Sequence, residues 1–308
     1  MKTLSRRELL KMSASLGLGA FFSPFLSILE QDRQMLKRAI PSSGEMIPAV
    51  GLGTWIQFDV GSSDSEREPL RKVLELMVKQ GGEVIDSSPM YGNAEEVVGD
   101  LTVDIGHPDH FFYATKVWTR GRESGINQMN ASMRKMRRET MDLIQVHNLV
   151  DWQTHLETLD EWKEEGKIRY KGVTHYTDAS HDDLEEIIRG RDIDFVQFNY
   201  SIRERNAEKS LLDAAMDNDV AVLINQPYGG GSLFQAVSGK ALPGWASEYD
   251  ISSWGQFFLK YILSHPAVTC VIPGTSDPEH LVDNMGAGYG KMPDEKTRKE
   301  MLRYFNNL

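Results

Sequence analysis

The chain has little cysteine: Cys270 is the only one among 308 residues. One thiol cannot form an intramolecular disulfide, and it excludes a zinc site built on several cysteine ligands. Stability therefore has to come from a buried core, which a chain of this length can supply. Hydrophobic residues make up 40% of the chain and charged residues 26%, a balance that excludes an intrinsically disordered or collagen-like protein.

Positive charge is scarce beyond the first 38 residues. Those residues hold seven basic and three acidic side chains, whereas the remaining 270 hold 27 basic and 42 acidic ones. Such an excess of negative charge repels nucleic-acid phosphates and anionic lipid headgroups over long range. We therefore expect no nucleic-acid partner for this protein.

Residues 1–36 predict an export leader. A basic segment, Ser5 to Lys11, precedes an uncharged and mostly apolar run, Met12 to Leu29, which is the order of a signal peptide. The alternative is an amphipathic helix, but eighteen uncharged residues give it no polar face. The Ser-Arg-Arg-x-Leu-Leu-Lys run resembles the twin-arginine (Tat) signal, which implies the Tat export machinery as a partner and a periplasmic location. No Ala-x-Ala cleavage site follows, so an uncleaved anchor in the inner membrane stays open.

Short apolar runs alternate with stretches of helical periodicity from residue 46 onward. Expected strands span residues 48–54, 83–87, 111–117, 143–147, 171–176, 195–200, 221–226 and 269–273. Expected helices between and after them span residues 66–80, 93–103, 123–138, 152–165, 180–189, 207–217, 253–264 and 278–285. The runs lack polar alternation, as is typical of parallel strands buried on both faces.

Eight strand–helix pairs predict an α/β fold, a single-domain (β/α)8 TIM barrel over residues 37–308. A β-hairpin from Lys37 to Ile47 is expected to plug the N-terminal end of this barrel. The alternative, a doubly wound sheet, usually carries a G-x-G-x-x-G fingerprint after its first strand. The run Gly51 to Thr54 does not match it, so the barrel is favoured.

Polar residues close strands two, three and four, at the face where such barrels carry their chemistry. The four candidates for catalysis are Asp86, Tyr91, Lys116 and His147. Lys116 is expected to lower the pKa of Tyr91, and Asp86 is expected to hold the ammonium group in place. His147 is expected to hydrogen-bond a carbonyl oxygen. This set can protonate a carbonyl oxygen, and because no side chain delivers hydride, a nicotinamide cofactor is implied.

Five separated motifs resemble those of the aldo-keto reductases in order and spacing. They lie at residues 51–55, 86–92, 114–116, 142–147 and 272–275, and the resemblance covers nearly all of residues 38–290. It implies NAD(P)H-dependent reduction of an aldehyde or ketone to an alcohol, with Tyr91 as the proton donor. It also implies a dinucleotide that lies extended across the barrel mouth without a Rossmann domain.

The resemblance also implies where the cofactor binds. The resemblance puts NADP(H) first. NAD(H) is a close second, because the run after strand eight, Gly274 to Asn284, contains no lysine or arginine for a 2′-phosphate. Thr174, His175 and Gln197 are expected at the nicotinamide carboxamide, and Asn225 occupies the place where an aromatic ring usually stacks. The other expected cofactor contacts are Thr54, Gly229, Gly231, Leu233, Gly274, Thr275, Ser276, His280, Asp283 and Asn284.

Trp55 and Trp118 follow strands one and three and are expected to wall a pocket for an apolar or aromatic carbonyl substrate. The segment from Gly229 to Tyr249 is the expected lid. A barrel that binds the nucleotide as a sensor or scaffold, with little turnover, remains the alternative from another class. A metal-dependent hydrolase is not expected, because of the eight histidines only His147 and His175 lie at strand ends.

Overall fold

The computed structural model describes residues 34–308, and Met35–Leu308 form one compact unit. The export leader predicted over residues 1–36 lies, except for its last three residues, outside the described part of the chain. No helix within residues 34–308 has both the length and the apolar character that crossing a bilayer requires.

Eight parallel strands form one sheet, with neighbours in the order β10-β9-β8-β7-β6-β5-β4-β3. Isolated bridges between Val50 and Val271 and between Gly53 and Gly274 join its two edges. The sheet is therefore a closed barrel, which confirms the predicted fold. Its strands are β3 (Leu52–Gly53), β4 (Val84–Asp86), β5 (Phe112–Val117), β6 (Met141–His147), β7 (Ile168–Thr174), β8 (Phe195–Asn199), β9 (Ala221–Asn225) and β10 (Cys270–Val271).

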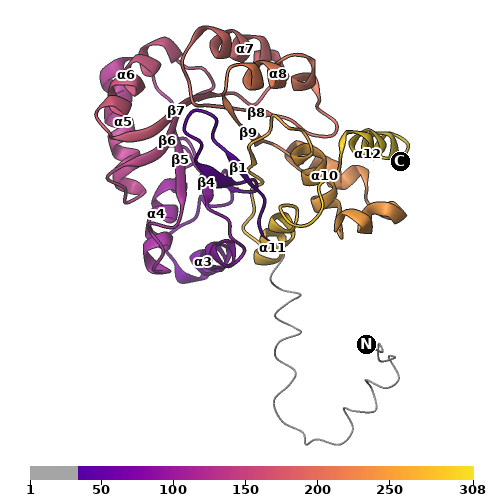
Figure 1. The fold of residues 1–308 in the computed structure, drawn as a ribbon. Coiled ribbons are helices and arrows are strands. Elements are labelled where there is room, and N and C mark those ends of the chain that lie inside the picture. Colours follow the sequence, from indigo (N-terminus) through magenta and orange to yellow (C-terminus); the bar gives the residue numbers. More distant parts are fainter. Residues whose placement is uncertain (1–33) are drawn as a thin grey trace, which may run out of the picture. The chain divides into compact units, whose positions relative to one another are not determined.

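Helices lie around the outside of the strands (Figure 1). They bury apolar side chains on their inner faces, which in α3 are Leu70, Val73, Leu74 and Met77. The helices are α3 (Asp64–Lys79), α4 (Ala94–Asp104), α5 (Arg122–Lys135), α6 (Trp152–Glu164), α7 (His181–Gly190), α8 (Leu211–Asp217), α9 (Ser232–Ala236), α10 (Trp254–Leu263), α11 (Pro278–Gly286) and α12 (Glu295–Asn306). Short 3-10 helices are η1 (Asp178–Ser180), η2 (Asn206–Lys209), η3 (Gly229–Gly231) and η4 (Gly244–Tyr249).

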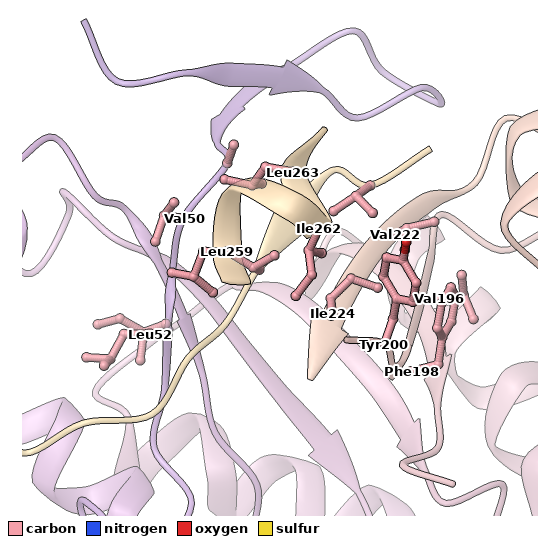
Figure 2. Close-up of a cluster of buried hydrophobic side chains, with 14 of the residues drawn as sticks. Val50, Leu52, Val196, Phe198, Tyr200, Val222, Ile224, Leu259, Ile262 and Leu263 are labelled. Carbon is pink, nitrogen blue, oxygen red and sulfur yellow. The ribbon is translucent and has the colours of Figure 1, made fainter. Parts of the chain in front are cut away.

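The core has an outer layer between the strands and the surrounding helices. Figure 2 shows part of it, where Leu259, Ile262 and Leu263 of α10 face side chains of the strands such as Val222 and Ile224. All five side chains are fully buried. Burying side chains of this size contributes roughly 1.5–3 kcal/mol each, so the barrel rests on many such contacts.

The β-hairpin plugs the N-terminal end of the barrel, as predicted. Strands β1 (Lys37–Ala39) and β2 (Met46–Pro48) pair antiparallel. Ile40 and Ile47 are fully buried and share one apolar cluster with inward-facing barrel residues such as Phe112 and Phe195. The guanidinium group of Arg38 donates hydrogen bonds to backbone carbonyls of residues 263, 265 and 268. The hairpin therefore closes this end and leaves the C-terminal mouth as the open end of the barrel.

The segment from Gly229 to Tyr249 is largely structured rather than a plain loop. It contains η3, α9 and η4, and Leu233 and Ala246 within it are buried in the core. Periodicity did not predict α9, because five residues are too few to show a helical repeat.

Candidate active site

A buried ion pair lies at the C-terminal ends of β4 and β5. Lys116 is fully buried, and its Nζ lies 2.6 Å from Oδ2 of Asp86, which is 4% exposed. The same ammonium group donates a hydrogen bond of 2.7 Å to the backbone carbonyl of Ser87. Burial lowers the pKa of Lys116, but the charge of Asp86 and the neighbouring Tyr91 raise it more, so the net shift is upward. Lys116 is therefore a fixed positive charge beneath the cavity floor.

Tyr91 stands beside this pair, in the turn between β4 and α4. Its ring centroid lies 5.3 Å from Nζ of Lys116. Its ring also meets the imidazole of His147 edge to face, with centroids 5.8 Å apart. The structure thus brings all four predicted catalytic side chains together at one end of the barrel.

The expected lowering of the Tyr91 pKa by Lys116 is present, but the effect of burial outweighs it. Burial raises the pKa of Tyr91, Lys116 lowers it and Asp86 raises it, and the net result is above the ordinary value of 10.0. The cation acts as predicted, but removing the phenol from water disfavours the phenolate more strongly. Tyr91 consequently keeps its proton at neutral pH.

His147 ends β6 and lines the same cavity. Burial, the charge of Lys116 and the nearby His175 lower its pKa to about 2. The imidazole is therefore neutral at physiological pH. A neutral imidazole offers one hydrogen-bond donor and one acceptor.

The rate of carbonyl reduction is expected to stay flat between about pH 6 and pH 8, because neither Tyr91 nor His147 changes protonation there. The measurement is kcat at saturating cofactor and substrate across that range. A step near pH 6.5 would show His147 titrating and would contradict the assignment.

The lowered pKa of His147 also makes the stability of the fold depend on pH. The unfolded chain takes up a proton on this imidazole below about pH 6.5, whereas the folded chain does so only near pH 2. Stability is therefore full above about pH 6.5 and falls as the pH drops towards 2.

A network of side-chain amides surrounds Asp86 on the cavity floor. Gln197 and Gln145 donate to its Oδ1 over 2.9 Å and 3.2 Å. Thr174 donates to Oε1 of Gln197 over 3.2 Å, and Nδ2 of Asn225 approaches the same oxygen at 3.4 Å. The network holds the ends of strands β4 and β6 to β9 in fixed relation.

A cavity of about 720 Å³ opens above these side chains. It is lined by the following residues predicted for the site: Thr54, Trp55, Asp86, Tyr91, His147, Thr174, Gln197, Asn225, Gly231 and Gly274. Tyr228 also lines it, as do Gly230 and Phe234 of the segment expected to be the lid. Residues that sequence reasoning did not assign line it as well, among them Ile56, Gln57, Met90, Asn148, Tyr176, Gln226 and Pro227. Most of these follow the strand ends directly, which is the one signal in the sequence that points to them.

Several predicted cofactor contacts are engaged within the protein. Both carboxylate oxygens of Asp283 accept hydrogen bonds from α10, through Ser253 and Gln256. Oδ1 of Asn284 accepts from the hydroxyl of Tyr228 over 2.5 Å. The remaining predicted residues outside the cavity lining are Lys116, Trp118, His175, Gly229, Leu233, Thr275, Ser276 and His280. Their roles stay predictions.

The cavity wall has two features that suit a nicotinamide dinucleotide. Oδ1 of Asn225 is buried and lacks a hydrogen-bond partner among residues 34–308, so it is free to accept from a carboxamide N–H. Gly230 and Gly231 have positive φ, and no atom lies within 4 Å of the position that a Cβ would take. Their backbone is therefore open to close approach by phosphate groups. The residues present fit such a cofactor.

Comparisons with known proteins agree with this geometry. A sequence model described as "Aldo/keto reductase family" matches residues 49–299. Methylglyoxal reductase YeaE of Escherichia coli (strain K12) is 27% identical over 258 residues, covering 81% of this chain and 89% of that protein. L-glyceraldehyde 3-phosphate reductase of the same organism is 26% identical, with coverages of 84% and 89%.

Among solved structures, an aldo-keto reductase from Klebsiella pneumoniae in complex with NADPH superimposes with a TM-score of 0.73. It is 23% identical, and the match covers 88% of this chain and 96% of that one. At this identity the likeness concerns the fold.

Proposed function

Since this chain belongs to the aldo/keto reductase family, we propose that it reduces an uncharged aldehyde or ketone, with Tyr91 as the proton donor. Membership of the family makes the chain an NAD(P)H-dependent oxidoreductase acting on carbonyl compounds. The observation that supports the assignment of the proton donor is the cluster of Tyr91, the Lys116–Asp86 ion pair and His147 around one cavity.

Each side chain of the cluster has a separate task in the proposed reaction. Bound NAD(P)H supplies hydride to the carbonyl carbon. Tyr91 hydrogen-bonds the carbonyl oxygen and transfers its proton as negative charge develops there. The phenolate left behind is stabilised by the nearby ammonium group of Lys116, whose position Asp86 fixes. His147 adds a neutral hydrogen-bond donor to the same oxygen.

The lining of the cavity favours an uncharged, partly apolar substrate. Its rim includes Trp55, Tyr176 and Phe234, which are 56%, 49% and 43% exposed. No lysine or arginine is among the residues that line it within the described chain. A phosphorylated aldehyde therefore lacks a cation to offset its charge, whereas methylglyoxal or an aromatic aldehyde needs none.

The assay follows NAD(P)H absorbance after addition of methylglyoxal, benzaldehyde or glyceraldehyde 3-phosphate to the purified protein. We expect turnover of the first two, with kcat/KM at least about 10-fold above that of the phosphorylated aldehyde, the effect of roughly 1.4 kcal/mol. Cofactor binding without oxidation by any carbonyl compound would favour a sensor or scaffold instead. The complete set of four catalytic candidates argues against that alternative.

NADP(H) is the first cofactor proposed, because the similar aldo-keto reductase from Klebsiella pneumoniae was solved in complex with NADPH. NAD(H) is the second, and the start of α11 is the feature that supports it. The start of α11 is capped by Asp277, whose Oδ1 accepts from backbone N–H groups of Glu279 and His280. A carboxylate at this place disfavours a second anion such as a 2′-phosphate. Dissociation constants for NADPH and NADH, measured by fluorescence, decide the order; a preference for NADPH above about 100-fold would show a phosphate site that these residues do not explain.

Export through the Tat machinery is proposed from the leader in the sequence, with a periplasmic or membrane-anchored mature protein. Its motivation is the basic run Ser5–Lys11 before the uncharged run Met12–Leu29. Cell fractionation of the full chain and of an Arg6→Lys/Arg7→Lys variant tests it. Equal amounts of both proteins in the periplasm would contradict export by this route.

A further inference from the structure

Ser88 lies two residues beyond the end of β4 and touches the imidazole of His147. Its side chain is fully buried, and its Oγ is 2.9 Å from Nδ1 of His147. The backbone N–H of Met90 points at the same Oγ from 3.3 Å. No role has been given to this hydroxyl group in the reaction described above.

The direction of the hydrogen bond follows from counting protons. The N–H of Met90 can only donate, so Oγ of Ser88 accepts there and keeps its own proton for another acceptor. Among the described residues, Nδ1 of His147 is the acceptor that the structure places within reach. If Nδ1 carried the proton instead, the buried hydroxyl proton would have no acceptor, which costs roughly 1–3 kcal/mol.

The other ring nitrogen then carries the proton of the neutral imidazole. His147 lines the cavity, and Nδ1 is turned towards the protein by its bond to Ser88. Nε2, on the opposite edge of the ring, has no partner recorded among residues 34–308. With Nδ1 as acceptor, Nε2–H is available as a donor; with the tautomers reversed, a lone pair would face the carbonyl oxygen and repel it.

We propose that Ser88 is a positioning residue, which donates its hydroxyl proton to Nδ1 of His147 and thereby fixes the Nε2–H tautomer that hydrogen-bonds the substrate carbonyl. The proposal rests on the proposed reduction of a carbonyl compound. It gives the oxygen two donors, the phenol of Tyr91 and the imidazole N–H. Neutral Ser88 sets the tautomer without making the ring cationic.

The central experiment replaces Ser88 by alanine in the full chain. Without the hydroxyl donor both tautomers become accessible, so kcat for aldehyde reduction is expected to fall about 10-fold. The dissociation constant of NADPH is expected to stay within about 2-fold, because Ser88 does not line the cavity. Ser132→Ala is the matched control, since Ser132 is also a buried serine, but it lies on α5. It is expected to retain full kcat.

Nitrogen-15 NMR of histidine-labelled protein reads the tautomer directly, with a His147→Gln sample to assign the signal. We expect a protonated Nε2 and an unprotonated Nδ1 in the wild type, and loss of that preference in Ser88→Ala. A protonated Nδ1 in the wild type overturns the proposal even if Ser88→Ala does not fold. Full kcat in a folded Ser88→Ala protein overturns it as well. If the wild type reduces no carbonyl compound, the proposed function fails, while the NMR result still decides the tautomer.

Discussion

Tyr91→Phe is expected to lower kcat for aldehyde reduction by two to four orders of magnitude, the usual effect of removing a positioned proton donor. The phenol is the acid of the cluster, and its raised pKa keeps it protonated at neutral pH. Phenylalanine retains the ring that meets His147 edge to face, so cofactor affinity is expected to change little. Single-turnover kinetics with NADPH, together with fluorescence titration of the cofactor, separates the two effects.

The control for this variant is Tyr289→Phe. The hydroxyl group of Tyr289 donates a hydrogen bond to the backbone carbonyl of Gln80, where α3 ends. Tyr289 does not line the cavity. It is expected to keep the wild-type kcat. Turnover by Tyr91→Phe at the wild-type rate would remove Tyr91 from its role and leave the proton donor unassigned.

Lys116→Met is expected both to abolish reduction and to destabilise the fold by about 3–5 kcal/mol, as for other buried pairs that lose one partner. The methionine fills nearly the same volume, but the carboxylate of Asp86 is then left buried without its cation. Urea unfolding of the cofactor-free protein measures the loss.

The double variant Asp86→Asn/Lys116→Met separates charge from packing. Removing both charges is expected to recover most of the stability, while activity stays absent because no ammonium group stabilises the phenolate. A single Lys116→Met variant as stable as the wild type would show that the pair contributes nothing to folding. Recovery of turnover in the double variant would show that the ammonium group is dispensable for the reaction.

The barrel was predictable from the sequence because its parallel strands are buried on both faces and their apolar runs stand out between amphipathic helices. All eight expected strands overlap observed ones, but their ends shift. β7 begins at Ile168, three residues before the expected start at residue 171. The expected start was late because the exposed Arg169 interrupts the apolar run that marks the strand. β10 spans only Cys270–Val271. The pairing that closes the barrel on its other side consists of two isolated bridges, Val50 to Val271 and Gly53 to Gly274, which do not extend the strand.

The four catalytic candidates were predictable because strand ends are fixed by the fold, whereas the rim of the cavity was not. Ile56 and Gln226 line that rim with positive φ, a conformation that hydrophobic periodicity does not encode. The contact joins Ser88, in the loop after β4, to His147 at the end of β6, 59 residues further along the chain. Spacing along the chain therefore gives no sign of it. The pKa of Tyr91 depends on its depth of burial, which only the three-dimensional structure supplies.

The plugged end of the barrel is the side through which the enzyme can be attached to a surface without blocking its cavity. Leu36 is hydrogen-bonded to Gly288, beyond the end of α11, and leads straight into the hairpin that seals that end. Leu36 itself therefore lies at the closed end of the barrel, opposite the catalytic opening. A protein that begins at Leu36 and is immobilised through its amino group should leave substrate and cofactor free to enter from solution.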